Sequence, residues 1–116
     1  MKKLMFVVLA LCMLAPLAYA APMMIKGTII DNACADANKA DLGNFVKTHP
    51  KSCAVMAACS AGGYSIYSDG KLIKFTDAST IKIAEFLKKD ASKLTVDITA
   101  NKVGDTLDLV SIKNSK

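Results

Sequence analysis

Residues 64–75 read YSIYSDGKLIKF and are typical of a β-hairpin. The dipeptide Asp69-Gly70 suits a tight two-residue turn, because both residue types tolerate the positive φ angles that such a turn requires. Apolar side chains recur at every second position on both sides of the turn, which places one face of the hairpin in the core. The cross-strand pairs expected on that face are Tyr64 with Phe75 and Ile66 with Ile73.

Regular elements are also predicted on both sides of this hairpin. Asp77 is expected to cap a helix that runs to about Lys89 and turns its apolar face toward the core. Residues 94–100 and 106–113 alternate as the two strands of a second hairpin. Residues 23–31 form the first expected strand, in which Gly27 marks a bulge or a sharp bend. The apolar face of the helix consists of Ile83, Ala84, Phe86 and Leu87.

This order of elements predicts the fold class. A strand, a long insert, a hairpin, a helix and a second hairpin follow the order of a small five-stranded OB-like barrel, in which the helix lies between the third and fourth strands. We therefore expect a mainly β protein with helices, of the α+β class, with a Cys-rich helical insert at about residues 32–63. An open ferredoxin-like sheet is the alternative, but it needs a substantial helix directly after the first strand.

The first twenty residues indicate export. Lys2 and Lys3 precede an apolar run from Leu4 to Leu17, and Ala18-Tyr19-Ala20 has the small-x-small pattern of a signal-peptidase site. The run of about 14 residues is shorter than the roughly 20 that a membrane-spanning helix needs. We expect residues 1–20, Cys12 included, to be removed, leaving 21–116 as one periplasmic or extracellular domain without a membrane anchor.

The charge of the expected mature chain argues against nucleic-acid binding. All 15 basic residues are Lys, and removal of two of them leaves 13 against 10 acidic residues, a net charge of +3. Without Arg, the chain lacks the planar guanidinium group that forms paired hydrogen bonds with phosphates and with guanine edges. The mildly basic net charge does not indicate which kind of molecule this surface binds.

The residues that could carry chemistry gather in the insert. Their order is Cys34, His49, Cys53, Met56 and Cys59. Pro50 suits the first turn of a helix and Gly62-Gly63 its end, so Cys53, Met56 and Cys59 are expected on one face of a single short helix. Taken alone, Met56 is typical of core packing and His49 of an exposed loop; their clustering is what makes them candidates.

Two interpretations of these cysteines are open. In an oxidising compartment a disulfide from Cys34 to Cys53 or Cys59 would pin the insert and leave one thiol free, for burial or for an intermolecular bond. Alternatively, Cys53, Cys59 and Met56, with His49 or Cys34, would hold a soft metal ion, with Cu(I) favoured by the thiol and thioether donors. Zinc would instead take Cys34, His49, Cys53 and Cys59.

The sequence predicts no enzyme. Cys-x-x-Cys and Cys-x-x-Cys-His are absent, no third group is evident to orient His49, and the nine aspartates are interpreted as solvated charges. Two functions of different class follow. The chain is either an exported soft-metal or thiol-redox binding protein, or a disulfide-stabilised module that binds a protein or another ligand without metal.

The spaced motifs resemble those of a known group of proteins. The pattern Gly27-x-Ile29-x-Asp31-x-x-Cys34 is followed by His49-x-x-x-Cys53 and then by Cys59-x-x-x-Gly63-Tyr64. It is similar to a group of small exported bacterial proteins of unknown function, over most of residues 21–116. The resemblance implies OB-like strand pairs in the second half of the chain, and no substrate, cofactor or catalytic residue.

Overall fold

The computed structural model describes residues 21–116, a mixed α+β fold of five strands and several helices. The signal peptide predicted at 1–20 and Cys12 lie outside the described residues. The strands are β1 (Met23–Asp31), β2 (Tyr64–Ser68), β3 (Lys71–Phe75), β4 (Thr95–Val103) and β5 (Thr106–Asn114). The helices are α2 (Asn32–Ala37), η2 (Lys39–Asp41), α3 (Leu42–Thr48), α4 (Lys51–Ala54), α5 (Ala57–Ser60) and α6 (Asp77–Leu87).

The five strands form one sheet in the order β1-β2-β3-β5-β4, which closes because β4 also pairs with β1. All pairs are antiparallel except the short parallel contact between β3 and β5. The predicted pairing of Ile66 with Ile73 is confirmed. β1 has two partners in succession, first β4 along Met23–Thr28 and then β2 along Thr28–Asp31.

Gly27 lies where β1 passes from one partner strand to the other. A Cβ at this position would lie 2.6 Å from the carbonyl oxygen of Tyr67 and 2.8 Å from Cγ1 of Ile66. Because neither distance is tolerated by an ordinary side chain, glycine permits the close approach of β1 to β2 at this position. The register of β1 shows no bulge at Gly27, so the close approach explains the glycine.

The main hydrophobic core lies between the sheet and α6. Tyr64, Ile66, Ile83 and Leu87 are all fully buried, as the alternation of the strands and the helical periodicity predict. The N-cap lies one residue earlier than predicted, since Thr76 occupies this position and Asp77 is the first helical residue. Ser79 connects α6 to β5, because its Oγ accepts a hydrogen bond of 2.8 Å from the backbone N–H of Leu109.

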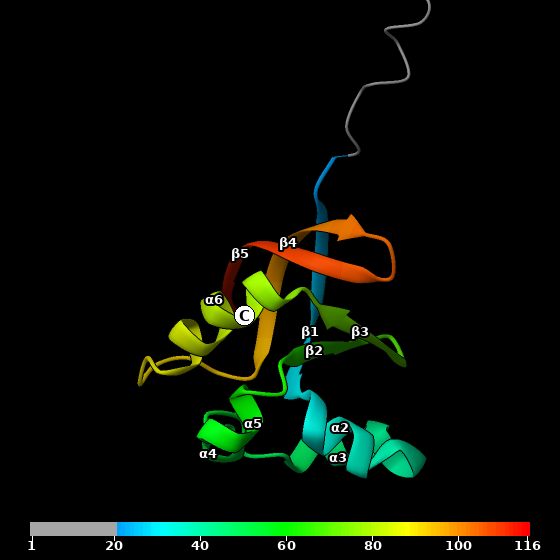
Figure 1. The fold of residues 1–116 in the computed structure, drawn as a ribbon, viewed down its shortest axis with the longest axis vertical. Coiled ribbons are helices and arrows are strands. Elements are labelled where there is room, and N and C mark those ends of the chain that lie inside the picture. The colour runs from blue at the N-terminus through cyan, green and yellow to red at the C-terminus, as the bar shows by residue number, and fades with distance from the viewer. Residues whose placement is uncertain (1–20) are drawn as a thin grey trace, which may run out of the picture.

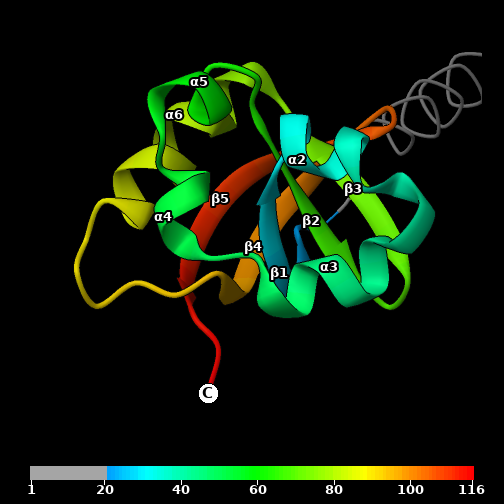
Figure 2. The same cartoon turned by 90° about the horizontal axis from the view of Figure 1, so that it is seen from below.

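The insert, residues 32–63, folds into short helices at one end of the strands. Figure 1 shows α2 to α5 together below the sheet, at the end opposite the β4–β5 turn. Figure 2 shows the same end from below, with α3 on one side of the β1 and β2 strand ends and α4 on the other. A second cluster of buried residues, Ile30, Ala35 and Val46, packs α2 and α3 against β1.

Among residues 21–116, no helix is long and apolar enough to cross a membrane.

Candidate functional site

Asp31 is the residue around which the candidate site forms. It is the last residue of β1 and the N-cap of α2, where its Oδ2 accepts a 3.0 Å hydrogen bond from the backbone N–H of Cys34. Its side chain is fully buried, and its Oδ1 has no hydrogen-bond partner among the described residues. This Oδ1 makes an ion-pair contact with His49 and keeps lone pairs for a further interaction, which makes Asp31 a candidate ligand.

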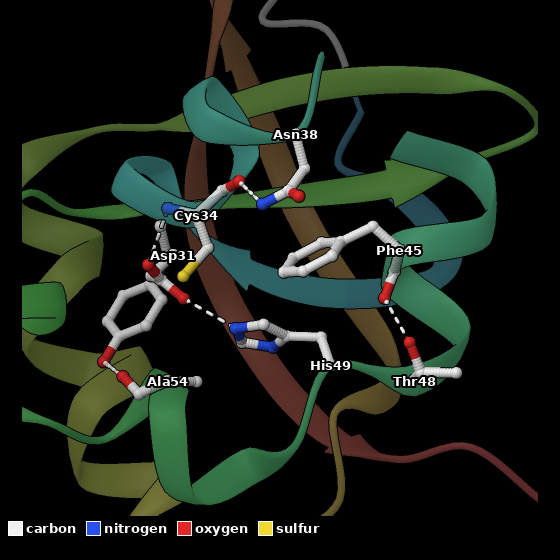
Figure 3. A network of polar contacts seen from close by, with 8 residues as sticks. Asp31, Cys34, Asn38, Phe45, Thr48, His49 and Ala54 are labelled. Carbon is white, nitrogen blue, oxygen red and sulfur yellow. Dashed lines mark hydrogen bonds and ion pairs between the residues drawn. The ribbon is translucent and has the colours of Figure 1, made fainter. Parts of the chain in front are cut away.

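His49 faces this carboxylate from the far side of the insert. Its Nε2 lies 3.1 Å from Oδ1 of Asp31, and its side chain is only 2% exposed. The contact lacks hydrogen-bond geometry, and neither ring nitrogen has a hydrogen-bond partner within residues 21–116. Figure 3 shows the His49 ring pointing toward Asp31 and Cys34. The expectation that a histidine before Pro50 lies in an exposed loop is therefore wrong.

The local structure explains why His49 is buried. Its backbone N–H donates a 3.0 Å hydrogen bond to the carbonyl of Phe45 and closes the end of α3. Its ring packs against the ring of Phe45, with centroids 5.2 Å apart. Pro50 cannot continue the helix, so the chain leaves α3 at this point and turns the imidazole inward.

Two of the three cysteines complete the cluster. One ligand atom from each of Asp31, Cys34 and Cys59 lies within 4.8 Å of the other two, so the Sγ atoms of Cys34 and Cys59 are neighbours. Cys34 belongs to α2 and Cys59 to α5, and these two helices are in contact. All three cysteines of residues 21–116 are free thiols and half-buried in this structure. Cys53, on α4, is outside the cluster.

The electrostatics of the cluster favour protonated thiols. Burial, together with a hydrogen bond between the thiol and the Asp31 side chain and with the negative charge of Asp31, raises the pKa of Cys34 to about 12. Burial and the charge of Asp31 also raise the pKa of Cys59, and they raise the pKa of Tyr64. A catalytic cysteine has a lowered pKa, so this environment opposes nucleophilic catalysis and would instead be relieved by a bound cation.

The predicted stripe of Cys53, Met56 and Cys59 on one helix is wrong. The chain forms two helices, Lys51–Ala54 and Ala57–Ser60, and the backbone of Met56 between them is extended, with φ −61° and ψ 140°. The Met56 side chain is 55% exposed. The carbonyl of Ala54, which a continuous helix would pair with residue 58, accepts a 2.7 Å hydrogen bond from the buried Tyr64 hydroxyl instead.

Hydrogen bonds made by Asn32 hold α5 beside Asp31. The N–H of Asn32 donates to the carbonyl of Gly63, and its side-chain amide donates to the carbonyl of Gly62, both at 3.0 Å. The hydroxyl of Ser65 donates a further hydrogen bond to the side-chain oxygen of Asn32. These contacts connect the residue after Asp31 to the segment after Cys59 and so bring the two together.

Hydrogen bonds made by Lys51 hold α4 in place. The ammonium of Lys51 donates to the carbonyl oxygens of Lys89 at 2.8 Å and Ser92 at 2.9 Å, and to the hydroxyl of Ser92 at 2.9 Å. The start of α4 is thereby fixed to the loop that follows α6.

Sequence reasoning missed Asp31 as a site residue. All nine aspartates were expected to be solvated, whereas Asp31 is completely buried. A signal was available in the chain: an acidic residue follows the apolar pair Ile29-Ile30 directly and stands three residues before Cys34. A charged residue at the end of a buried strand and at a helix N-cap is constrained by the structure on both sides.

Comparison with known proteins adds no family. The chain has no significant match among protein families, curated proteins or solved structures. The resemblance to small exported bacterial proteins stays a prediction.

Proposed function

We propose that the protein binds one metal ion through Asp31, Cys34, His49 and Cys59. The observation that carries the proposal is the buried contact between Oδ1 of Asp31 and Nε2 of His49, neither of which has a hydrogen-bond partner among residues 21–116, with the thiols of Cys34 and Cys59 beside Asp31. Buried polar atoms are nearly always paired, and coordination of a metal ion would pair these.

The spacing of the donors supports this set. In a tetrahedral site with bond lengths of 2.0–2.3 Å, neighbouring donor atoms are about 3.3–3.8 Å apart. Oδ1 of Asp31 and Nε2 of His49 are 3.1 Å apart, and the ligand atoms of Asp31, Cys34 and Cys59 all lie within 4.8 Å. Asp31 therefore lies close to each of the other three donors, and binding of the ion would require His49 to approach the two sulfurs as well.

The donor types favour zinc over copper(I). The preference for copper depends on the thioether of Met56, but this side chain is exposed between α4 and α5. The observed cluster contains the carboxylate of Asp31 and no thioether. Two thiolates, one imidazole and one carboxylate are ligands that Zn²⁺ accepts, whereas copper(I) prefers sulfur.

The proposal extends to the fold type and to the cellular location. The closed strand order and the position of α6 between β3 and β4 support an OB-like barrel. The signal-peptide pattern of residues 1–20 supports export to the periplasm or beyond.

A second candidate function is a disulfide-stabilised binding module without metal. It is favoured by the proximity of the Sγ atoms of Cys34 and Cys59, which lie within 4.8 Å of each other. This disulfide would pin α2 to α5 and leave Cys53 as the unpaired thiol, available for a bond to another molecule.

Native mass spectrometry of the reduced protein with added Zn²⁺, after removal of adventitious metal with a chelator, tests the proposal. We expect one zinc ion per chain. Loss of a residue that hydrogen-bonds to a metal ligand typically weakens metal binding by roughly 10- to 100-fold. Cys34→Ser and Cys59→Ser remove a ligand itself, so each should weaken zinc binding by more than this. Cys53→Ser is the matched control and should bind as the parent does.

Two results would decide against the metal site. One is a reduced parent protein that retains no zinc at a micromolar concentration of the free ion. The other is equal weakening by Cys53→Ser, which would place the ligands elsewhere. Alkylation and intact-mass measurement without reductant distinguish the second candidate, since a disulfide protects two thiols and leaves one reactive.

A further inference from the structure

The metal site and the nearby disulfide pair use the same two sulfur atoms. The Sγ atoms of Cys34 and Cys59 lie within 4.8 Å of each other and of a ligand oxygen of Asp31. A sulfur that joins a disulfide is no longer a thiolate and loses its role as a strong metal ligand. We infer that oxidation of Cys34 and Cys59 by a small-molecule disulfide releases the bound metal ion, an inference that rests on the proposed function.

The fold permits the short movement that this reaction needs. A disulfide has an S–S length of about 2.05 Å, so the two sulfurs must approach each other by less than about 3 Å. Cys59 lies on a helix of four residues, bounded by the extended Met56 on one side and by Gly62-Gly63 on the other. Cys34 is held at the N-terminus of α2 by Asp31.

The reaction balances as two thiol–disulfide exchanges. The Cys59 thiolate attacks one sulfur of the small disulfide, whose S–S bond breaks and releases one thiolate. The Cys34 thiolate then attacks the Cys59 sulfur of this mixed disulfide, forms the Cys34–Cys59 bond and releases the second small thiolate. Two electrons pass from the cysteines to the small disulfide, and the metal ion keeps its oxidation state.

Release of the ion follows from the donors that remain. Asp31 and His49 alone supply two ligands, and both anionic sulfurs are gone. Two protein donors hold a zinc ion far more weakly than four, so the ion passes to solvent or to another chelator. Reduction of the disulfide would restore the site. The fraction of protein that holds a metal ion would therefore depend on the ratio of thiols to disulfides in the surroundings.

Oxidised glutathione and the zinc-loaded Cys53→Ser protein provide the test. This variant leaves Cys34 and Cys59 as the only cysteines of residues 21–116. A chromogenic zinc indicator follows release, while intact mass and peptide mapping without reductant follow the disulfide. We expect one zinc ion released for each Cys34–Cys59 bond formed, and rebinding of the ion after removal of oxidant and addition of a thiol-free reductant. The parent protein should behave in the same way.

The outcomes separate this inference from the proposed function. Zinc that stays bound after the Cys34–Cys59 bond has formed would overturn the inference and leave a metal site with other ligands. A parent protein that binds zinc but forms its disulfide through Cys53 would also overturn it. Reduced protein that binds no zinc would overturn both proposals.

Discussion

At the scale of single residues, Asp31 links the end of a strand, the start of a helix and the candidate ligand set. Its Oδ2 caps α2 through the N–H of Cys34, while its Oδ1 faces His49 at 3.1 Å. Asparagine is also a favourable N-cap, so Asp31→Asn keeps the cap and removes the charge. The substitution therefore separates the structural role of the residue from its role toward a metal ion.

We expect Asp31→Asn to lower zinc affinity by at least about 10-fold while the free energy of unfolding of the metal-free protein changes by less than about 1 kcal/mol. Isothermal titration with Zn²⁺ and urea unfolding measure the two quantities. Asp36→Asn, on the exposed face of the same helix, is the control and should alter neither. Equal affinities for Asp31→Asn and Asp36→Asn would remove Asp31 from the ligand set.

The raised pKa of Cys34 predicts how the stability of the metal-free protein depends on pH. The folded protein keeps this thiol protonated up to a pKa of about 12, whereas the unfolded chain loses the proton near the ordinary value of 9.0. The resulting stabilisation is complete below pH 9 and is lost as the pH rises from 9 toward 12.

Urea unfolding at a series of pH values across this window should therefore show a steeper fall in unfolding free energy for the parent protein than for Cys34→Ser. Cys53→Ser keeps both Asp31 and Cys34 and should follow the parent. Parallel curves for the parent and Cys34→Ser would show that burial beside Asp31 does not perturb this thiol.

At the scale of elements, β1 determines the geometry of the sheet and delivers Asp31 to the site. Gly27→Ala would place a methyl group 2.6 Å from the backbone carbonyl of Tyr67, which moves only if β2 moves. We expect this substitution to cost about 1–3 kcal/mol of unfolding free energy in a denaturant titration. At Gly62 the added methyl group has an ordinary 3.7 Å contact, so Gly62→Ala should stay within about 0.5 kcal/mol of the parent. Similar losses for both variants would contradict this account of the close approach at Gly27.

Sequence reasoning predicted the elements whose signals are local. The Asp69-Gly70 turn, the alternation in residues 94–100 and the apolar face of α6 all depend on neighbours within a few positions, and all three elements are present. The break between α4 and α5 was not predicted from local signals. At the break, the carbonyl of Ala54 accepts a hydrogen bond from the hydroxyl of Tyr64, a contact between residues that lie ten positions apart.

The candidate site could be predicted only in part, because some of its contacts join residues that are distant in sequence. The clustering of Cys34, His49 and Cys59 in one insert was visible in the sequence. The approach of His49 to Asp31 was not, because it depends on how α3 packs on β1 through Ile30 and Val46. Single-residue expectations, an exposed histidine and a solvated aspartate, were both reversed by this packing.

At the scale of the whole molecule, the site joins segments that are distant in the chain. Asp31 ends the first strand, His49 follows the last residue of α3, and Cys59 belongs to α5. A metal ion held by these residues and Cys34 would connect the insert to the sheet and would bind the folded protein more tightly than the unfolded chain. Binding should therefore raise the stability of the whole domain.

Zinc at about 100 times its dissociation constant should stabilise the reduced protein by about 2.7 kcal/mol, or about 10–20 °C in melting temperature for a domain of this size. Differential scanning calorimetry with and without Zn²⁺ measures the shift, and a chelator should reverse it. The Cys34→Ser/Cys59→Ser double variant should show little shift. An equal shift in that variant would mean that zinc acts at another place on the protein.

The central claim concerns the atoms that surround the metal ion, and zinc K-edge X-ray absorption spectroscopy of the reduced, zinc-loaded protein tests it most directly. Coordination by Asp31, Cys34, His49 and Cys59 predicts two sulfur neighbours at about 2.3 Å and two nitrogen or oxygen neighbours at about 2.0–2.1 Å, with outer-shell scattering from one imidazole ring. Cys53→Ser should give the same spectrum. A first shell of oxygen and nitrogen alone, or one with three sulfur atoms, would contradict the site described for this protein.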